Sequence, residues 1–591
     1  MEVYMLKLLK NLNKRDYIYV FISAGLIVFQ VWLELKMPDY MSNITQLVQT
    51  RGASINDILR EGSYMLLCAF GSLVSAFIVG YFTSTIAASF SYRTRGKLFR
   101  KVEDISTFEV KKFSPSSLIT RTTNDITQIE FLIAMGLTLM IKAPITAVWA
   151  VTKILNKNIE WSILTGVAVL VLLITIGIIM MIVMPKFKIV QELMDKINMV
   201  MRENLSGIRV VRAFNAEKYQ EDKFENVNNT LTNQQVFNQK AFNFLSPVMY
   251  LVMYFLTLGI YFIGAMLINE ANMGDKIVLF GNMIVFSSYA MQVIMSFLML
   301  AMIFMMLPRA SVSAKRINEV LDTPISVKEG NVTMNNSDIK GCVEFKNVSF
   351  KYPDADEYVL EDISFKVNKG ETIAFIGSTG SGKSTLINLI PRFYDATSGE
   401  ILINGIDVRD YSFEYLNNII GYVPQKATLF SGDILSNVSF GKNIDGKPSN
   451  KKIADALRVS QASEFVSKLE DGEKSHIAQG GTNVSGGQKQ RLSIARTIAR
   501  NPEIYIFDDS FSALDYKTDS TLRRELREYT KDATVMIVAQ RIGTILNADK
   551  IVVLDNGKCV GVGTHNELMK KCKVYKEIAL SHVSKEELEN V

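Results

Sequence analysis

The stretch GSTGSGKST, from Gly377 to Thr385, decides how the second half of this 591-residue chain folds. It follows the apolar segment 372–376 and precedes a helical pattern over 386–390, the strand, loop and helix order of a phosphate-binding loop. The glycines let backbone amides approach phosphate, while Lys383 meets the β and γ oxygens and Ser384 holds Mg²⁺. The loop alone therefore predicts a nucleoside triphosphate ligand. The residues assigned to that ligand are Gly377, Ser378, Thr379, Gly380, Ser381, Gly382, Lys383, Ser384 and Thr385.

The first half of the chain differs in character, because nearly all long apolar runs fall before Pro308. Each run is near or above the roughly 17 to 25 residues that cross a bilayer. Buried helices of soluble proteins rarely run so far without charge. Several runs exceed a hydrocarbon core of roughly 30 Å at about 1.5 Å per residue, so the helices are predicted to continue into the cytoplasm. The six predicted spans are 17–33, 62–92, 131–152, 161–185, 241–269 and 277–308.

Charge asymmetry orients these spans. Segments 1–16, 93–130 and 186–240 hold 4, 8 and 9 Lys and Arg residues, whereas 34–61, 154–160 and 270–276 hold 3, 1 and 1. The positive-inside rule places the first set and the amino terminus in the cytoplasm, and six crossings return the second half to that side. The charged start lacks a following cleavage site, which predicts a retained signal anchor in the cytoplasmic membrane.

These patterns predict a multi-domain membrane protein. An all-α six-helix transmembrane domain is followed by an α/β phosphate-loop ATPase domain with a helical subdomain. Alternating strand pattern begins at Val343, after a polar linker. The predicted limits are 1–320 for the transmembrane domain with its two cytoplasmic loops, 321–342 for the linker and 343–591 for the nucleotide-binding domain.

Composition excludes other classes. The net charge of +6 lies mostly in cytoplasmic loops that face an anionic leaflet, so membrane lipid is an expected partner and nucleic acid is not. Neither a disulfide framework nor a metal site is indicated, because the cysteines show no paired spacing. The four cysteines are Cys68, Cys342, Cys559 and Cys572.

A second motif narrows the class. Asn483 to Gln490 read NVSGGQKQ, which resembles the signature sequence of ATP-binding-cassette proteins, with Val484 replacing the usual leucine. The whole chain resembles ATP-binding-cassette exporters in which six spans are fused to one nucleotide-binding domain. It is most similar to the degenerate-site subunit of bacterial heterodimeric multidrug exporters. The signature residues expected to face a second chain's nucleotide are Ser485, Gly486, Gly487 and Gln488.

The resemblance implies roles for matching positions, with ATP and Mg²⁺ as cofactors. Tyr352 in FKYP would stack on adenine, and Gln425 in YVPQ would touch Mg²⁺ or the attacking water. Asp508 would support Mg²⁺ at the end of the apolar strand 504–507, and Asp515 in SALD would sit where two nucleotide-binding domains meet. The implied metal-binding residues are Ser384, Gln425 and Asp508.

Two cytoplasmic segments resemble the intracellular loops of these exporters, in which short transverse helices dock on nucleotide-binding domains. They are 116–128, SSLITRTTNDITQ, and 202–217, RENLSGIRVVRAFNAE. By themselves both read as charged, solvated helices. The resemblance makes them the predicted coupling loops.

Two catalytic positions depart from the family pattern. Asp509 stands where competent members carry glutamate, and its shorter side chain withdraws the carboxylate by about 1 Å, a displacement that can cost about 100-fold. Gln540 in VAQR replaces a histidine; it can hydrogen-bond a γ-phosphate but cannot transfer a proton. Gln479 replaces an acid ahead of the signature, which puts the usual contact with the partner's loop in doubt. The predicted catalytic positions are Asp509, Gln540 and Gln425.

These departures favour a heterodimer. Its partner would be a similar half-transporter chain with Glu and His at the positions of Asp509 and Gln540. The pair would use ATP to export amphipathic drugs, lipids or peptides, and this chain alone would hydrolyse ATP weakly. Three alternatives are an ATP-gated channel or regulatory membrane protein, an importer built on the exporter fold, and a self-sufficient homodimeric exporter.

Two intramembrane features invite a substrate hypothesis. Lys142 is costly inside a span and requires a partner, a water-filled cavity or snorkelling, so structural pairing and function are both open. Five methionines of the last span share one helical face, which either lines an adaptable apolar pathway or packs against lipid and helices. They are Met291, Met295, Met299, Met302 and Met306.

Overall fold

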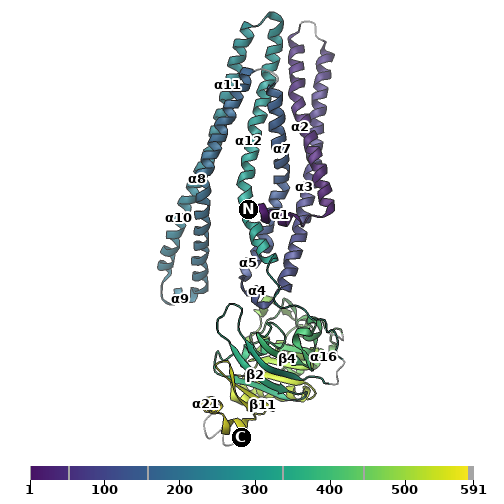
Figure 1. Ribbon diagram of the computed structural model, residues 1–591, viewed down its shortest axis with the longest axis vertical. Helices are drawn as coiled ribbons and strands as arrows, with labels where there is room; N and C mark the ends of the chain where they lie inside the picture. The colour runs from purple at the N-terminus through teal and green to yellow at the C-terminus, as the bar shows by residue number, and fades with distance from the viewer. Residues whose placement is uncertain (1, 51–53, 156–158, 336–338, 443–445, 583–591) are drawn as a thin grey trace. The chain divides into compact units, whose positions relative to one another are not determined.

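The computed structural model describes residues 2–50, 54–155, 159–335, 339–442 and 446–582. The chain divides into two compact units (Figure 1). The first unit comprises Met1–Val102 and Ser114–Thr323, and the second comprises Glu103–Phe113 and Pro324–Val591. The expected linker 321–342 contains residues 336–338, which lie outside the described residues.

The first unit is all-helical within its described residues. Helix α2 begins with a capping box in which Asn13 and Asp16 exchange side-chain and backbone hydrogen bonds. The helices are α1 (Glu2–Leu9), α2 (Lys14–Gln49), α3 (Ile55–Asp104), α5 (Pro115–Thr120), the π-helical turn η1 (Arg121–Asp125), α6 (Ile126–Phe131), the π-helical turn η2 (Leu132–Gly136), α7 (Leu137–Leu155), α8 (Ile159–Ser206), α9 (Ile208–Ala213), α10 (Glu217–Asn243), α11 (Leu245–Glu270) and α12 (Met273–Leu321).

The six predicted membrane spans are confirmed, because six helices among the described residues are long and apolar enough to cross a bilayer. Helix α3 has 50 residues and α12 has 49, so each runs for about 75 Å and exceeds a hydrocarbon core of roughly 30 Å. The spans are 14–49, 55–104, 115–155, 159–206, 217–270 and 275–303.

The first cytoplasmic loop differs from its prediction. The short helix lies at Thr107–Lys111 (α4), within the segment that clusters with the second unit. Residues 116–128 instead start the third long helix. Ser114 accepts a hydrogen bond from the Ser117 amide and Pro115 occupies the first helical turn, so this local sequence begins a helix that continues through η1 and η2.

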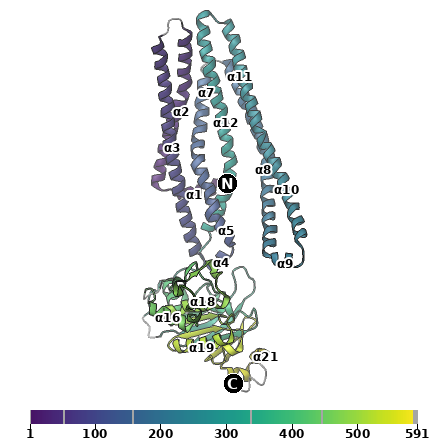
Figure 2. The same cartoon turned by 180° about the vertical axis from the view of Figure 1, so that it is seen from behind.

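The second cytoplasmic loop contains the expected short helix. Helix α9 lies within 202–217 and connects α8 to α10, which pack side by side (Figure 2). Gly207, the residue before α9, separates it from α8. Val210 and Phe214 in this loop are 60% and 78% exposed, so the tip offers apolar side chains outside the first unit's core.

Lys142 has an ion-pair partner inside the membrane domain. Of the two interpretations left open for this residue, structural pairing is therefore observed. Its Nζ lies 2.8 Å from Glu34 Oε1, and the same oxygen accepts hydrogen bonds from Gln30 and Ser72. A second pair, Lys153 with Asp39 at 2.9 Å, joins the same two helices, α2 and α7. Two half-buried ion pairs therefore join α2 to α7.

The methionine face of α12 stays open between its two readings. Met295 and Met302 are 43% and 44% exposed in the single chain. Met291, Met299 and Met306 are half-buried.

The second unit is built on a ten-stranded sheet in the order β5-β4-β1-β2-β12-β11-β3-β10-β9-β6. Strands β11, β3, β10, β9 and β6 are parallel neighbours, and β7 and β8 form a separate pair. The strands are β1 (Val343–Phe350), β2 (Leu360–Val367), β3 (Thr372–Gly377), β4 (Ser398–Ile403), β5 (Ile406–Asp407), β6 (Ile420–Val423), β7 (Gly432–Asp433), β8 (His476–Ile477), β9 (Ile504–Asp508), β10 (Thr534–Val538), β11 (Lys550–Asp555) and β12 (Lys558–Gly563).

Helices cover this sheet and enclose two apolar cores. One core is formed by side chains of α15 to α18 that pack on side chains of the parallel strands. The other core is formed by side chains of β1, β2, β4 and α13. The predicted α/β class is confirmed. The helices are α13 (Lys383–Asn388), η3 (Val408–Asp410), α14 (Phe413–Ile419), α15 (Ile434–Val438), α16 (Asn450–Val459), α17 (Ser463–Val466), η4 (Gly472–Lys474), η5 (Gln479–Gly481), α18 (Gly486–Arg500), α19 (Tyr516–Tyr529), η6 (Ile542–Thr544), α20 (His565–Lys571) and α21 (Lys573–His582).

The Lys142–Glu34 pair generates a stability prediction. Lys142→Met leaves the Glu34 carboxylate largely buried without its counter-ion, and we expect a loss of about 1 to 3 kcal/mol in stability. The double variant Glu34→Leu with Lys142→Met removes both charges and should recover more than half of that loss. Thermal unfolding of the full chain in detergent measures both. Lys10→Met removes an exposed cation and serves as control; a double variant as unstable as the single one would contradict the pairing.

Candidate nucleotide-binding site

The phosphate loop lies between the end of β3 and the start of α13, as its sequence predicts. Gly380 and Gly382 adopt φ angles of +86° and +94°, in the left-handed region that suits glycine. A Cβ on Gly382 would lie 2.7 Å from Leu360 Cδ2 and 3.1 Å from the Val359 carbonyl oxygen. Glycine at this position therefore lets the backbone pass close to β2 while it turns into α13.

Lys383 folds back onto its own loop. Its Nζ donates hydrogen bonds to the carbonyl oxygens of Gly377 and Ser378, at 2.9 and 2.7 Å. Burial lowers the pKa of Lys383, and the nearby carboxylates of Asp509 and Asp508 oppose that shift. The ammonium thus lies against the phosphate loop. Lysine side chains and backbone amides of such loops bind phosphate oxygens.

Asp508 and Ser384 form the oxygen pair that can share a divalent cation. Ser384 Oγ donates to Asp508 Oδ1 at 2.9 Å, and Tyr422 lies near the other carboxylate oxygen. Asp508 is 4% exposed at the carboxyl end of β9. Burial raises its pKa, and the adjacent charge of Asp509 adds to that rise. A small hard cation such as Mg²⁺ prefers these oxygen ligands.

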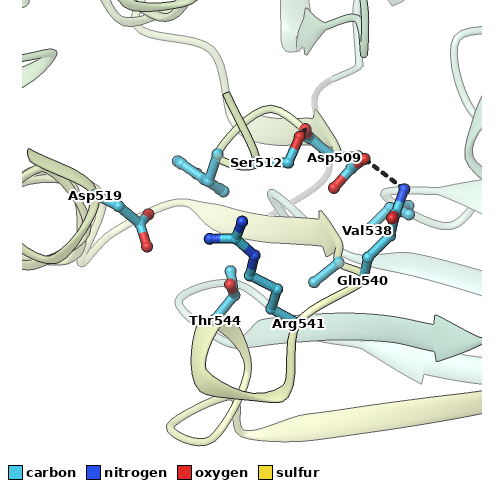
Figure 3. A pocket seen from close by; sticks show the side chains of 9 residues that line it. Asp509, Ser512, Asp519, Val538, Gln540, Arg541 and Thr544 are labelled. Atoms are coloured by element: carbon cyan, nitrogen blue, oxygen red, sulfur yellow. Dashed lines mark hydrogen bonds between the residues drawn. The ribbon is translucent and has the colours of Figure 1, made fainter. Parts of the chain in front are cut away.

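Asp509 is held by two side-chain amides. Gln540 Nε2 donates to Asp509 Oδ2 at 2.7 Å, as Figure 3 shows, and Gln425 Nε2 donates to the same oxygen at 3.3 Å. Asp509 has a φ of +46°, an unusual backbone angle for a residue with a side chain. Burial raises the pKa of Asp509, against the opposing effects of hydrogen bonding with Gln425 and Ser512 and of the cations Lys383 and Arg541.

A small pocket lies beside Asp509 and Gln540. It is lined in part by Arg541, a cation that sequence reasoning missed. The Arg541 guanidinium points into the pocket, in the space between Asp519 and Asp509 (Figure 3). Its charge favours the ionised form of Asp509. The signal was present in the sequence, because Arg541 directly follows Gln540 in VAQR. The pocket is lined by Asp509, Phe511, Ser512, Asp519, Val538, Ala539, Gln540, Arg541 and Thr544.

Tyr352 reaches the phosphate-loop helix from the end of β1. Its hydroxyl lies 3.2 Å from Thr385 Oγ1, and its ring meets the edge of Tyr394 with centroids 5.4 Å apart. The ring is half-buried in this position. It is therefore anchored close to the phosphate loop, and its stacking on adenine stays a prediction.

The signature residues form a separate, exposed helix start. Ser485 caps α18: its hydroxyl accepts from the Gln488 amide, while the Gln488 side chain accepts from the Ser485 amide. Ser485 and Gly486 are exposed, and nothing lies within 4 Å of a Cβ built on Gly486. Helix N-termini of this kind attract anions.

The predicted site residues thus fall into two groups. The first group clusters within the parallel sheet edge, and comprises Lys383, Ser384, Gln425, Asp508, Asp509 and Gln540, with Tyr352 beside the loop. The second group is the signature. No hydrogen bond joins it to the first group in the described part of the chain. Asp515 caps α19 through the Thr518 amide at 3.0 Å, and the role expected for it between two domains stays a prediction.

Fold and site together define a membrane-spanning phosphate-loop ATPase. The family described as ABC transporter matches residues 360–512, and the family described as ABC transporter transmembrane region matches residues 19–307. The chain belongs to the ABC transporter family. Membership implies ATP hydrolysis coupled to transport, by a multi-pass membrane protein.

Similar proteins cover nearly the whole chain. An uncharacterized ABC transporter ATP-binding protein of Mycobacterium tuberculosis (strain ATCC 25618 / H37Rv) is 39% identical over 92% of this chain and 93% of its own length. An ATP-dependent lipid A-core flippase of Pseudomonas aeruginosa is 30% identical over 85% of this chain and 82% of its own. The structure of a bacterial Atm1-family ABC exporter with ATP bound shares the fold. Its TM-score is 0.80 at 22% identity, over 96% of this chain and 99% of that one.

The carboxylate pair generates a pH prediction. The pKa values of Asp508 and Asp509 are raised, so these groups keep their protons at a higher pH than ordinary aspartates. A cation must displace those protons, and we expect the Mg²⁺-dependent gain in ATP affinity to shrink as pH falls from 8 to 5. Nucleotide-binding titrations with and without Mg²⁺ measure the gain.

Two variants test the origin of that dependence. Asp508→Asn should lower the Mg²⁺-dependent gain and flatten its pH profile, after allowance for the titration of ATP itself. Ser384→Ala removes one ligand but keeps both carboxylates, so the affinity should fall while the pH profile persists. An unchanged profile in Asp508→Asn would mean that other groups control the metal.

Proposed function

We propose that this chain is one subunit of a heterodimeric ATP-driven exporter, with a slow ATP site of its own. The observation that carries the proposal is the Asp509 carboxylate, held by the amides of Gln540 and Gln425. Half-transporters of this family function as dimers in which each ATP lies between one chain's phosphate loop and the other chain's signature. The domain limits 1–320, 321–342 and 343–591 belong to the same proposal.

The held carboxylate explains slow hydrolysis. A general base must reach the proton that it accepts, within about 2.6 to 3.2 Å or through one water. Asp509 is one methylene shorter than glutamate, and one of its oxygens already accepts from two amides. Gln540 can orient that carboxylate but cannot carry a proton. Both replacements therefore act against activation of water at this site.

The same residues fit ATP and Mg²⁺ well. Tyr352 would stack on adenine and Lys383, with the loop amides, would hold the phosphates; Ser384, Asp508 and Gln425 would hold Mg²⁺. Bound Mg²⁺ would neutralise charge on the β and γ phosphates. Binding without efficient cleavage makes this half a long-lived clamp.

The signature supports the second part of the proposal. Ser485 to Gln488 start α18 at an exposed helix N-terminus, with amide groups available to phosphate from outside this chain. We assign them to the working site on the partner's phosphate loop. That partner carries Glu and His at the positions of Asp509 and Gln540, so its own loop forms the hydrolytic site.

The transported class is proposed from the membrane unit and from the names of relatives. Its spans expose large apolar side chains, and the relatives include proteins whose names describe a lipid A-core flippase and a multidrug export protein. We propose amphipathic drugs, lipids or peptides as substrates, exported across the cytoplasmic membrane. The amino terminus and the ATPase domain would face the cytoplasm, in accord with the charge asymmetry of the loops.

The first test compares the chain alone with the assembled pair. Purified alone, it should show little ATPase activity, and addition of the partner should raise activity by at least about tenfold, because a missing base typically costs about 100 to 10,000-fold. ATPase assays in nanodiscs, with transport measured in inverted vesicles, supply both readouts. Brisk turnover by the chain alone would exclude the slow-site proposal.

The second test separates the slow site from the working one. Gly486→Asp places a carboxylate at the exposed signature, where no atom of this chain lies within 4 Å of the new Cβ. We expect it to abolish more than about nine-tenths of the pair's turnover, because it repels phosphate. Asp509→Asn should reduce turnover by less than about threefold. Asp532→Asn removes an exposed carboxylate and controls for substitution alone.

The order of the two effects decides the assignment. If Asp509→Asn stops hydrolysis as completely as Gly486→Asp does, the working and slow sites must be exchanged. Binding of ATP to the pair, measured in parallel, shows whether each variant still folds and loads.

A further inference from the structure

A groove lies between α11 and α12 in the membrane unit, near the hairpin that joins them at the top of Figures 1 and 2. Its volume is about 360 Å³, within the roughly 300 to 1,000 Å³ of small-molecule sites. Met283 forms a buried part of its wall, and Phe280 and Ile268 add half-buried apolar side chains. These side chains give the groove an apolar wall.

Its polar side chains gather toward the hairpin. Asn269 and Lys276 line the groove close to the connection between the two helices, whereas Tyr261 and Met283 line it further along. From Tyr261 to Asn269 the helix rises about 12 Å, and from Lys276 to Met283 about 10 Å. That length spans most of one leaflet of a hydrocarbon core roughly 30 Å thick.

Lys276 lacks a counter-ion in the described part of the chain. It is half-buried, and its ammonium makes no ion pair or hydrogen bond with another described residue, while its backbone amide donates to the Asn272 carbonyl oxygen. The Asn269 side-chain amide and the Tyr261 hydroxyl belong to exposed residues, and neither makes a hydrogen bond with another described residue. Glu270 and Asp275 are exposed and do not line the groove. Lys276 also lies in the first turns of α12, where the helix dipole favours negative charge.

We propose that this groove binds one anionic phospholipid of the surrounding membrane, as a resident lipid. The headgroup phosphate would lie against Lys276 and Asn269, and one acyl chain would follow the apolar wall toward Met283. Charge complementarity selects an anionic headgroup, and the polar-to-apolar gradient gives its direction. The loop 270–276 carries one cation, Lys276, which the charge asymmetry of the sequence assigns to the outer side. The residues that line this groove all belong to one chain, and the proposal requires no particular partner chain or transported molecule.

Photolabelling tests the proposal directly. The full-length chain is placed in phosphatidylcholine nanodiscs with a trace of phosphatidylglycerol that carries a photoreactive group in its acyl chain, and labelled peptides are identified by mass spectrometry. We expect labelling of 261–283 by this probe, and at least about fivefold less by a phosphatidylcholine probe with the same chain.

Two variants and a matched control locate the site. Lys276→Gln should lower phosphatidylglycerol labelling about fivefold and leave phosphatidylcholine labelling unchanged. Ala265→Phe fills the groove from an exposed position of α11, so labelling by both probes should fall. Arg60→Gln removes an exposed cation at the outer end of α3, away from the groove, and should change nothing. Thermal unfolding verifies that each variant folds.

Three results would overturn the proposal. Equal labelling by the two probes would show that the groove does not select an anionic headgroup. Unchanged labelling in folded Lys276→Gln and Ala265→Phe would show that the lipid does not bind in this groove. A loss of labelling when the active transporter turns over ATP before irradiation would show a transported molecule in place of a resident lipid.

Discussion

The parallel register of three strands positions the whole candidate site. Val538 of β10 lies opposite Asp508 of β9, and β3 pairs with β10 on its other side. Because parallel strands end at one edge of a sheet, the phosphate loop after β3, the carboxylates after β9 and Gln540 after β10 meet there. A shift of one residue along β9 would turn Asp508 away and separate Asp509 from Gln540. The roles proposed for Lys383, Asp508 and Asp509 depend on this register.

Local patterns made much of the fold predictable. The phosphate loop is one continuous motif, so it could be predicted from the sequence. The spans could be predicted as well, because long apolar runs indicate helices that lie in lipid. The first cytoplasmic loop was harder, because 116–128 and Thr107–Lys111 are both polar and helical in pattern. Ser114 and Pro115 decide between them by starting the longer helix at that point. A capping signal of two residues is weaker evidence in a sequence than a resemblance that extends over a whole loop.

Long-range partners were beyond sequence reasoning. Lys142 was recognised as costly, but Glu34 lies 108 positions away and only the packing of α2 on α7 identifies it. Likewise, the replacements at Asp509 and Gln540 were read as two separate losses. The structure joins them in one hydrogen bond. The Gln540 amide donates to the short Asp509 carboxylate, so a substitution at either residue removes or alters a partner of the other.

That bond has a consequence for how the site can evolve or be repaired. Replacing Gln540 by histidine alone would remove the amide that holds Asp509, and the carboxylate would still end one methylene short of the water it must activate. Replacing Asp509 by glutamate alone would push a longer carboxylate toward Gln540, which cannot take its proton. Neither single change supplies both a base in reach and a proton-carrying partner. If the site is slow as proposed, both positions would have to change together to restore hydrolysis, and single substitutions would leave a nucleotide clamp.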